Sequence, residues 1–291
     1  MARNTLPVLA VLAILLYSHC KTAQPEAPWI DLFNGADLQG WDTYLGPKFI
    51  VRDTGGVRKD SVPVGLNTDP DGVFSVVSVD GEPAIRISGT GFGGISTTGE
   101  FENYHLRLQF KWGQLKSPPR DQGKMDSGVL YHAVGPHGAD YGYWMRSQEF
   151  QIQEGDCADY WGVAGGLFDI PATLNADSAW VYDPKGQLQT FSADGPNGRH
   201  CIKNPDTEKP TGEWNTIDLY CSGDTAVHMV NGVVNMVLYR SRQSDEGRET
   251  PLVRGKIQLQ SEGAEVYYRR IQVQAIERLP AGLGGIEESK N

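Results

Sequence analysis

Acid and amide side chains alternate with apolar ones along residues 146–154, which read RSQEFQIQE. Such alternation is typical of a β-strand whose successive side chains point to opposite faces of its sheet. It predicts that Phe150 and Ile152 face a core. Glu149 and Gln151 then face a polar groove on the other side. Because carboxyl and amide groups pack poorly but bond well to hydroxyl groups, we predict a carbohydrate site on this strand.

Glu149 is the candidate general base, because a carboxylate in a row of polar groups is well placed to accept a proton. Glu154 is a candidate second acid, but five residues along a regular strand is an odd step that puts the two glutamates on opposite faces. A β-bulge between them would bring both to one face. Arg146 is a candidate catalytic donor to a developing oxyanion. Each of these charges is alternatively an ordinary solvated surface group.

His132 is a third candidate catalytic residue and lies in the apolar stretch 127–134. If Val129 is in the core, strict alternation places His132 in the groove, where it could act as an acid, a base or a metal ligand. A divalent metal held by His132, Glu149 and Glu154 is a further option, although no ligand spacing in the chain is diagnostic. No other cofactor is indicated.

Further polar and aromatic side chains could bind sugar hydroxyls or stack on a sugar ring. The candidate substrate-binding residues are Lys111, Gln151, Gln258, Gln260, Trp161, Tyr143 and Trp144. Amides and charges of this kind also occur on ordinary exposed strands, and loop aromatics are as often packed. Their roles are therefore hypotheses.

Alternating segments occur through much of the chain, and no amphipathic helix pattern is found. The predicted strands are residues 73–79, 84–88, 104–112, 127–134, 146–154, 212–221, 226–230, 233–239, 255–262 and 266–273. Strands with one polar face favour an all-β fold, an antiparallel two-sheet jelly-roll sandwich. Residues 53–72 and 89–99 are predicted as loops. Residues 155–213 are predicted as a loop-rich insertion that forms a rim or lid.

The chain has 291 residues, including 35 glycines and 17 prolines. Its formal net charge of −10 argues against a nucleic-acid partner, because phosphates would need a basic surface. Arg3 and the apolar stretch 6–17, too short to span a membrane, predict a signal peptide at residues 1–20. We expect a lipoprotein-type signal with lipidation at Cys20 and a tether at residues 21–29. The protein would then be exported to the cell envelope, periplasm or outer membrane and contact the membrane only through its anchor; secretion is the alternative.

Three further cysteines are Cys157, Cys201 and Cys221. An oxidising compartment allows one disulfide among them. Cys157 and Cys201 are predicted to pair, because both lie in polar, turn-rich stretches. Cys221 ends an apolar strand and is predicted to be a small buried hydrophobic residue.

Short motifs follow one another in a fixed order: LFNG at 32–35, NYHLRLQFK at 103–111, DSGVL at 126–130, EFQI at 149–152 and GKIQLQ at 255–260. Together they resemble the 3-keto-disaccharide hydrolase domain family. The resemblance implies a concanavalin A-like jelly-roll domain at residues 30–277, followed by a tail at 278–291. It also implies an exported glycosyl hydrolase that acts on glycosides oxidised at C3.

A ketone at C3 of a sugar acidifies the C2 hydrogen, so the glycosidic bond can break by proton abstraction and elimination, followed by addition of water. The expected substrate is therefore a 3-keto-glycoside or disaccharide. Residues 149–154 also resemble the E-x-D-x-x-E strand of laminarinase-type glycosidases, with Gln151 in place of the middle acid. An ordinary retaining glycosidase and a non-catalytic carbohydrate-binding module are the alternatives.

Overall fold

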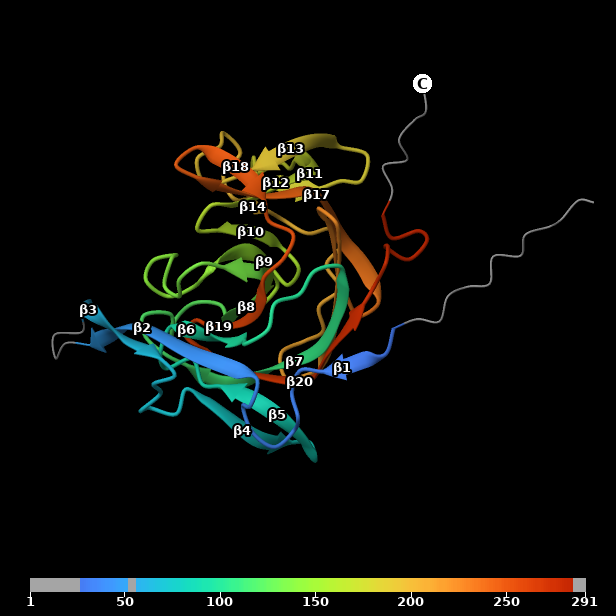
Figure 1. Ribbon diagram of the computed structural model, residues 1–291. Helices are drawn as coiled ribbons and strands as arrows, with labels where there is room; N and C mark the ends of the chain where they lie inside the picture. The colour runs from blue at the N-terminus through green and yellow to red at the C-terminus, as the bar shows by residue number, and fades with distance from the viewer. Residues whose placement is uncertain (1–26, 52–55, 285–291) are drawn as a thin grey trace, which may run out of the picture.

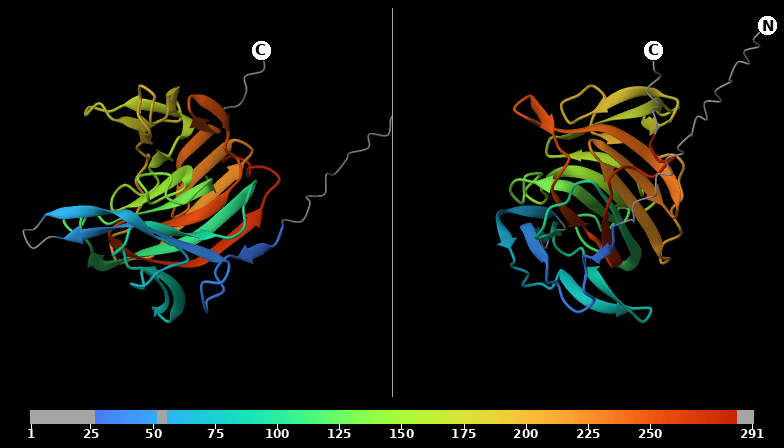
Figure 2. Two further views of the ribbon diagram at one scale, coloured as in Figure 1. Left: turned by 60° about the vertical axis from the view of Figure 1, so that its left-hand side comes forward. Right: turned by 45° about the vertical axis from the view of Figure 1, so that its right-hand side comes forward.

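The structure is a computed structural model that describes residues 27–51 and 56–284. Two antiparallel sheets lie face to face, and no helix occurs in these residues (Figures 1 and 2). The predicted all-β jelly-roll sandwich is therefore confirmed. Nothing in the described part of the chain is a helix long and apolar enough to cross a bilayer. The predicted signal peptide and Cys20 lie outside the described residues.

One sheet has twelve strands, nine of them in the order β12-β11-β17-β16-β15-β7-β20-β5-β4. They are β1 (Trp29–Asp31), β4 (Phe74–Val79), β5 (Glu82–Ile87), β7 (Tyr104–Lys116), β11 (Gly166–Leu174), β12 (Trp180–Tyr182), β13 (Gln187–Phe191), β15 (Asn215–Ser222), β16 (Thr225–Val230), β17 (Val233–Asp245), β18 (Arg248–Pro251) and β20 (Ala264–Ala275). The other sheet has eight strands in the order β14-β10-β9-β8-β19-β6-β2-β3. They are β2 (Trp41–Val51), β3 (Val57–Leu66), β6 (Gly93–Thr97), β8 (Asp126–Val134), β9 (Arg146–Gln153), β10 (Tyr160–Val163), β14 (His200–Cys201) and β19 (Lys256–Ser261).

The main core lies between the two sheets and is formed by alternate side chains of their strands. Leu106, Leu108 and Phe110 of β7 are fully buried in it. Phe150 and Ile152 of β9 enter the same core from the opposite sheet, as the alternation predicted. Burial of each such side chain stabilises the fold by about 1.5–3 kcal/mol. The other faces of β7 and β9 are therefore opposite outer surfaces of the sandwich.

Three stretches predicted as loops contain strands, so these predictions are wrong in part. Residues 53–72 include β3, residues 89–99 include β6, and residues 155–213 include β10 to β14. In β6, Gly93 and Gly94 hide the alternation because they have no side chain. A Cβ at Gly94 would lie 2.8 Å from Cγ of Gln258, so glycine permits the close approach of β19.

The predicted disulfide between Cys157 and Cys201 is wrong, because both are free thiols. Both side chains are buried in the core, although their chain neighbours are polar turn residues. Each cysteine acts there as a small hydrophobic residue, as Cys221 does. Burial raises the pKa of the Cys157 thiol well above its usual value, which keeps it protonated.

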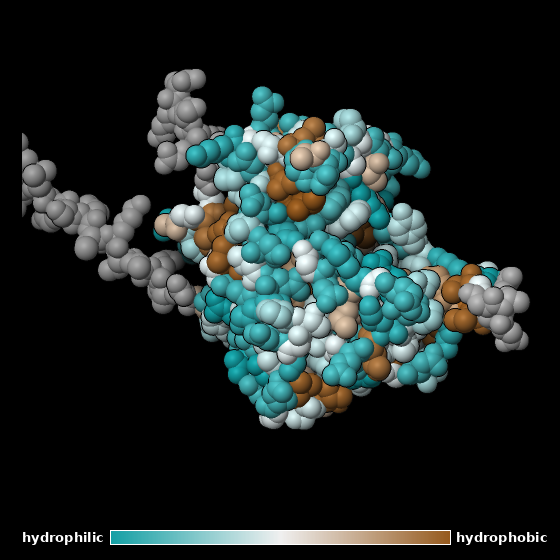
Figure 3. All heavy atoms as spheres, turned by 180° about the vertical axis from the view of Figure 1, so that it is seen from behind, coloured by the Kyte–Doolittle hydropathy of each residue, from teal (hydrophilic) through white to brown (hydrophobic). Residues whose placement is uncertain are grey.

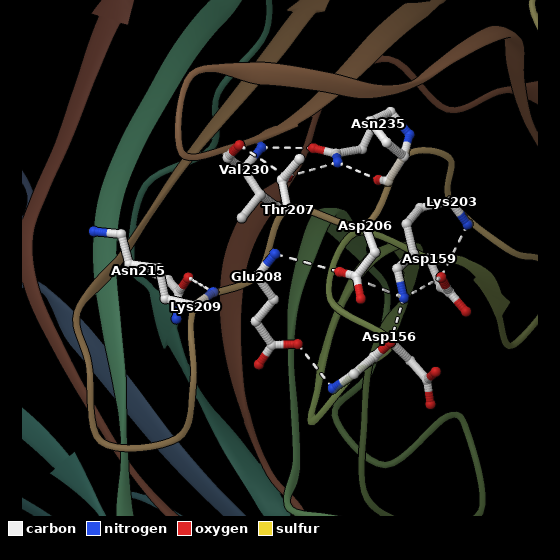
Figure 4. Close-up of polar contacts among 12 residues, drawn as sticks. Asp156, Asp159, Lys203, Asp206, Thr207, Glu208, Lys209, Asn215, Val230 and Asn235 are labelled. Carbon is white, nitrogen blue, oxygen red and sulfur yellow. Dashed lines mark hydrogen bonds and ion pairs between the residues drawn. The ribbon is translucent and has the colours of Figure 1, made fainter.

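A polar cluster attaches the segment after β14 to the turn between β9 and β10 (Figure 4). The carboxylate of Asp159 accepts a hydrogen bond from the backbone N of Lys203 at 2.9 Å, and the Lys203 ammonium lies 3.8 Å from the same carboxylate. Glu208 accepts a hydrogen bond from the backbone N of Gly155 at 2.8 Å. Because Asp159 and Lys203 are buried, breaking their pairing would be costly. The cluster therefore fixes the turn that follows β9.

The β2–β3 hairpin projects from the body of the molecule (Figures 1 and 2). Its outer part exposes aliphatic side chains, including Val51, Val57 and Val62. Figure 3 shows hydrophobic atoms at this outer end, on an otherwise mostly hydrophilic face. Nearer its base, Phe49 of β2 packs on the rings of Phe92 and Tyr143, which places the hairpin beside the candidate site described below.

Alkylation of the denatured but unreduced protein should modify Cys157 and Cys201 completely, because neither forms a disulfide. Peptide mass spectrometry measures the modified fraction, and the same digestion after reduction is the control. A peptide pair cross-linked through these two cysteines would contradict the structure.

Candidate functional site

A pocket of about 450 Å³ opens on the outer face of the eight-stranded sheet, over β8, β9, β10 and β19. Its volume is in the range of small-molecule sites, roughly 300–1,000 Å³. The predicted site residues that line it are Glu149, Gln151, Gln260, Trp161, Tyr143 and Trp144. The structure thus brings together six residues from three separate parts of the sequence.

Gly128 of β8 lies next to three residues that line the pocket, Glu149, Gln151 and Gln260. It lies opposite Gln151 in the β8–β9 ladder. A Cβ on Gly128 would lie 2.2 Å from Oε1 of Glu149 and 3.1 Å from Oε1 of Gln260. The missing side chain therefore creates the space that the Glu149 carboxyl group occupies, with one amide on each side.

Glu149 is 6% exposed, although its carboxyl group lines the pocket. Burial raises the pKa of Glu149 well above the usual range of a glutamic acid, and the nearby carboxylates of Glu262 and Asp126 raise it further. The positive charge of Arg199 opposes this shift. A carboxyl group in this setting is a stronger base than a solvated one once it is ionised.

Three buried oxygens on the floor have no hydrogen-bond partner among the described residues. They are Oε1 of Gln151, Oε1 of Gln260 and Oδ1 of Asp126. An unpaired buried acceptor costs about 1–3 kcal/mol. A ligand that carries several hydroxyl groups could donate hydrogen bonds to these oxygens. Saccharides are ligands of this kind.

A second acidic group lies at the other end of the floor. Nη1 of Arg120 donates to Oε1 of Glu262 at 2.7 Å, and Nη2 of Arg120 donates to Oδ2 of Asp126. Gln153 also donates to Oδ2 of Asp126, at 2.5 Å. Burial raises the pKa of both Asp126 and Glu262, the carboxylate of Asp126 raises the pKa of Glu262 further, and the charge of Arg120 opposes both shifts. Two carboxyl groups therefore share one guanidinium.

Aromatic side chains form the walls of the pocket. Tyr143 and Trp144 pack with Phe92 in a separate small apolar cluster, so most of their surface is used in packing. Nε1 of Trp144 donates to a backbone carbonyl of β6 at 2.9 Å, which holds the wall to the sheet. Trp161 lies across the pocket and stacks on His200, with ring centroids 4.2 Å apart. One face of Trp161 is thus occupied.

Arg199 places a positive charge at the rim. Its guanidinium lies 3.3 Å from the carboxylate of Asp140 and 5.5 Å from the ring centroids of Tyr141 and Trp161. These contacts join the loop before β9 to the segment before β14. Tyr141 is 67% exposed, so this part of the rim is open to solvent. Arg199 can donate to an anionic or carbonyl oxygen of a ligand.

Lys111 and Arg146 lie outside the pocket, so the structure does not group them with Glu149. Lys111 belongs to β7 in the opposite sheet, where its ammonium lies 3.0 Å from Asp80. Arg146 is an odd number of positions from Glu149 on β9 and points to a separate hollow. There its guanidinium lies 2.8 Å from Asp245.

The expectation that His132 faces the groove is wrong, because β8 is bulged. Val129 is in the core as assumed, but the register shifts between Tyr131 and Val134, and His132 has a φ of 52°. The extra residue breaks the alternation. Nδ1 of His132 lies 3.0 Å from the carbonyl oxygen of Leu252, and the side chain is buried beside core aromatics.

Glu154 does not join Glu149, because β9 pairs with β8 in continuous register from Gln148 to Gln153. Its carboxylate instead accepts a hydrogen bond from Thr211 at 2.6 Å. The metal-ligand set predicted from His132, Glu149 and Glu154 is therefore not formed. Elsewhere in the described residues, no group of three or more His, Cys, Asp or Glu side chains could hold a metal ion.

Gln258 contacts the backbone of the segment that forms the pocket wall. Its Oε1 accepts a hydrogen bond from the backbone N of Met145 at 3.2 Å, and its side chain is fully buried. It therefore positions the chain that follows Trp144, and does not line the cavity. The substrate-binding role predicted for it has no support in this placement.

The sequence interpretation missed five charged residues that line the pocket: Arg120, Asp126, Asp140, Arg199 and Glu262. The alternation that selected Gln258 and Gln260 reaches Glu262 at the next step, so this residue carried a signal. Asp126 precedes Gly128 by two positions and carried the same signal on β8. The two arginines lie between strands, where no periodicity applies.

Gly128→Ala should displace the carboxyl group of Glu149, because the new Cβ would lie 2.2 Å from its Oε1. The unfolding temperature should change little, since the atom that must move is the end of a flexible side chain and Gly128 has no left-handed φ. A crystal structure and thermal unfolding measure both effects. Gly99→Ala, which points into open space, is the control. An unmoved Glu149 in the first variant would contradict the packing described.

Glu149→Gln should stabilise the protein at high pH relative to the wild type. A carboxyl group whose pKa is raised by folding binds its proton more tightly in the folded state, so stability is lost as pH rises above the unfolded value of about 4.3. The glutamine variant lacks this loss. Denaturant unfolding between pH 5 and pH 8 measures the difference, with Glu154→Gln as the control outside the pocket. If the free energy of unfolding changes with pH in the same way in the wild type and in Glu149→Gln, the pKa of Glu149 is not raised by folding.

Comparison with known proteins identifies the family. No curated protein matches the chain. Two structures of candidate glycosyl hydrolases from Parabacteroides distasonis are each 18% identical with a TM-score of 0.46, covering 85% and 86% of this chain and 94% and 100% of theirs. A carbohydrate-binding module from Bacillus subtilis is 8% identical with a TM-score of 0.38, covering 69% of this chain and 91% of its own. Nothing about activity follows from similarities this distant.

A family model matches residues 28–274, nearly all of the described chain. Its description is a 3-keto-α-glucoside-1,2-lyase-like domain. The match confirms the resemblance indicated by the ordered motifs, and it includes every residue that lines the pocket. The chain therefore belongs to the family of 3-keto-α-glucoside-1,2-lyase-like domains.

Proposed function

We propose that this protein is an exported enzyme that cleaves the glycosidic bond of 3-keto-glycosides or disaccharides by C2 proton abstraction and elimination, followed by hydration. One observation carries the proposal: the carboxyl group of Glu149 lines a pocket of small-molecule size while being almost completely removed from solvent. Such a group is suited to take a proton from carbon, which needs a strong base. The family match supports the same chemistry.

Glu149 is the base in this mechanism and removes the hydrogen from C2 of the sugar. The electron pair released forms an enolate with the C3 ketone, and a cationic donor lowers the energy of that charge. Arg199 is the donor that we assign, in place of Arg146 and Lys111, because it lines the pocket. Collapse of the enolate forms a C1–C2 double bond and expels the oxygen at C1. Water then adds across the double bond.

The sugar is held by the polar floor and the aromatic walls. Gln151 and Gln260 offer unpaired buried oxygens to hydroxyl groups. Trp161 offers a ring whose far face is supported by His200, so its near face can contact a sugar ring. These features favour a compact, hydroxyl-rich ligand over an apolar one.

The regular ladder of β9 weakens the retaining-glycosidase alternative. That mechanism needs two carboxyl groups about 5–5.5 Å apart on one face. Glu149 and Glu154 do not form such a pair, because no bulge lies between Gln148 and Gln153. Elimination from a ketone does not need a second carboxyl group on the same face of β9, so it fits the observed strand better. Anchoring through a lipid on Cys20 stays a prediction.

The purified protein should release 4-nitrophenol from 4-nitrophenyl 3-keto-glucoside and leave the unoxidised parent glucoside intact. Only the ketone makes the C2 hydrogen acidic enough for removal. Absorbance of the released phenol measures the rate, and Glu149→Gln should lower it by about 10²–10⁴-fold. Glu154→Gln is the matched control and should retain full activity.

Two results would reject this proposal. Equal cleavage of both glucosides would indicate an ordinary glycosidase. Binding of the keto sugar that survives Glu149→Gln, without turnover by the wild type, would indicate a carbohydrate-binding module.

A further inference from the structure

We infer that Asp126, held by Arg120 beside Glu262, is the general acid that protonates the leaving-group oxygen. This inference rests on the elimination proposed above and adds the second proton-transfer group that it requires. Departure of an alkoxide or a sugar oxygen without a proton is slow, because the negative charge would develop on a poor leaving group. A site specialised for this reaction therefore needs an acid as well as a base.

The charge arrangement favours a retained proton on the pair Asp126 and Glu262. Both carboxyl groups contact the same guanidinium, that of Arg120, so one positive charge faces two acids. Arg199, the other pocket arginine, is paired with Asp140. Full ionisation of Asp126, Glu262 and Glu149 would thus leave excess negative charge in a largely desolvated pocket. A shared proton relieves this repulsion.

Burial and hydrogen bonding together favour Asp126 as the member of the pair that presents the proton. Its Oδ2 accepts hydrogen bonds from both Arg120 and Gln153, whereas its Oδ1 has no partner in the described chain. Oδ1 is therefore the oxygen available to hold a proton and to contact a ligand. Gln153 and Arg120 are positioning residues, because they act on Oδ2.

The spacing between the carboxyl groups of Asp126 and Glu149 suits one sugar ring. Asp126 lies two positions before Gly128 on β8, a step of about 7 Å along the same face of the strand. The Glu149 carboxyl group lies directly over Gly128. A sugar ring seated on this floor can therefore contact Glu149 with the hydrogen on C2 and Asp126 with the oxygen on C1.

The atoms and electrons balance over the two steps. Glu149 takes the proton from C2, and the C–H electron pair forms the enolate with the C3 ketone. When the enolate collapses, the C3 carbonyl is restored and this electron pair forms the C1–C2 double bond. The C1–O bond breaks, its electron pair stays on the oxygen, and Asp126 gives that oxygen its proton. Glu149 ends protonated and Asp126 ionised. Proton exchange with solvent through the open rim restores both groups.

The test compares two keto sugars and two variants of the full-length protein. Methyl 3-keto-glucoside has a poor leaving group, whereas 4-nitrophenyl 3-keto-glucoside has a good one that needs no protonation. Asp126→Asn should lower cleavage of the methyl glycoside by about 10²–10⁴-fold and cleavage of the nitrophenyl glycoside by less than about 10-fold. Glu149→Gln should lower both alike.

Hydrogen exchange at C2 separates the acid from the base. In D₂O, Asp126→Asn should still exchange the C2 hydrogen of the methyl glycoside faster than buffer alone, because Glu149 is intact. Glu149→Gln should lose this exchange. NMR of the recovered sugar measures it, and retained exchange also shows that the Asp126→Asn variant is folded. If that variant does not fold, Glu262→Gln should show the same leaving-group selectivity to a smaller degree.

The outcomes distinguish a failure of the role assigned to Asp126 from a failure of the proposed function. Two results for folded Asp126→Asn would overturn the role of Asp126 and leave the proposed function standing. In one, both glycosides are cleaved more slowly by the same factor and C2 exchange is lost. In the other, neither glycoside is cleaved more slowly. A wild-type protein that neither cleaves a keto sugar nor exchanges its C2 hydrogen would overturn the proposed function itself.

Discussion

The two-residue alternation along β9 is the constraint on which the site depends. Phe150 and Ile152 fill the core between the sheets, while Glu149 and Gln151 line the pocket on the other face. A shift of one residue would exchange the two sets and bury Glu149 and Gln151 in the core. The hydrophobic contacts that stabilise the fold therefore also hold the pocket polar groups in register. The polar cluster around Asp159 strengthens this register by fixing the turn after the strand.

The acidic residues of the pocket differ in the number of positive charges that lie beside them. Asp140 pairs with Arg199, whereas Asp126 and Glu262 share Arg120. For Glu149, burial is the main cause of the raised pKa. The carboxyl groups of Glu149, Asp126 and Glu262 therefore differ in how much positive charge opposes their burial, although all three lie within one small cavity. Such separation of acids into proton donors and acceptors is a common property of active sites and usually costs stability. The extensive core of the sandwich can offset that cost.

Much of the fold follows from alternation, and much of the site follows from the fold. The long alternating strands, such as those containing Phe110 and Phe150, are predictable because each buries one face. β6 is not, since its glycines leave no pattern to read. Lys111 shows the main limit for the site: alternation reveals that a side chain is outside the core, but not which of the two outer surfaces it joins. His132 shows another, because one bulge reverses every facing beyond it.

The space over Gly128 links two positions that are far apart in sequence. The glycine is required by the carboxyl group beside it and not by its own backbone conformation. The two residues thus form one packing unit, in which a larger residue at 128 is compatible only with a shorter or reoriented residue at 149. Positions 128 and 149 should therefore covary across the family. Members that combine a side chain at 128 with a small residue at 149 would have reshaped the pocket floor and adopted a different chemistry.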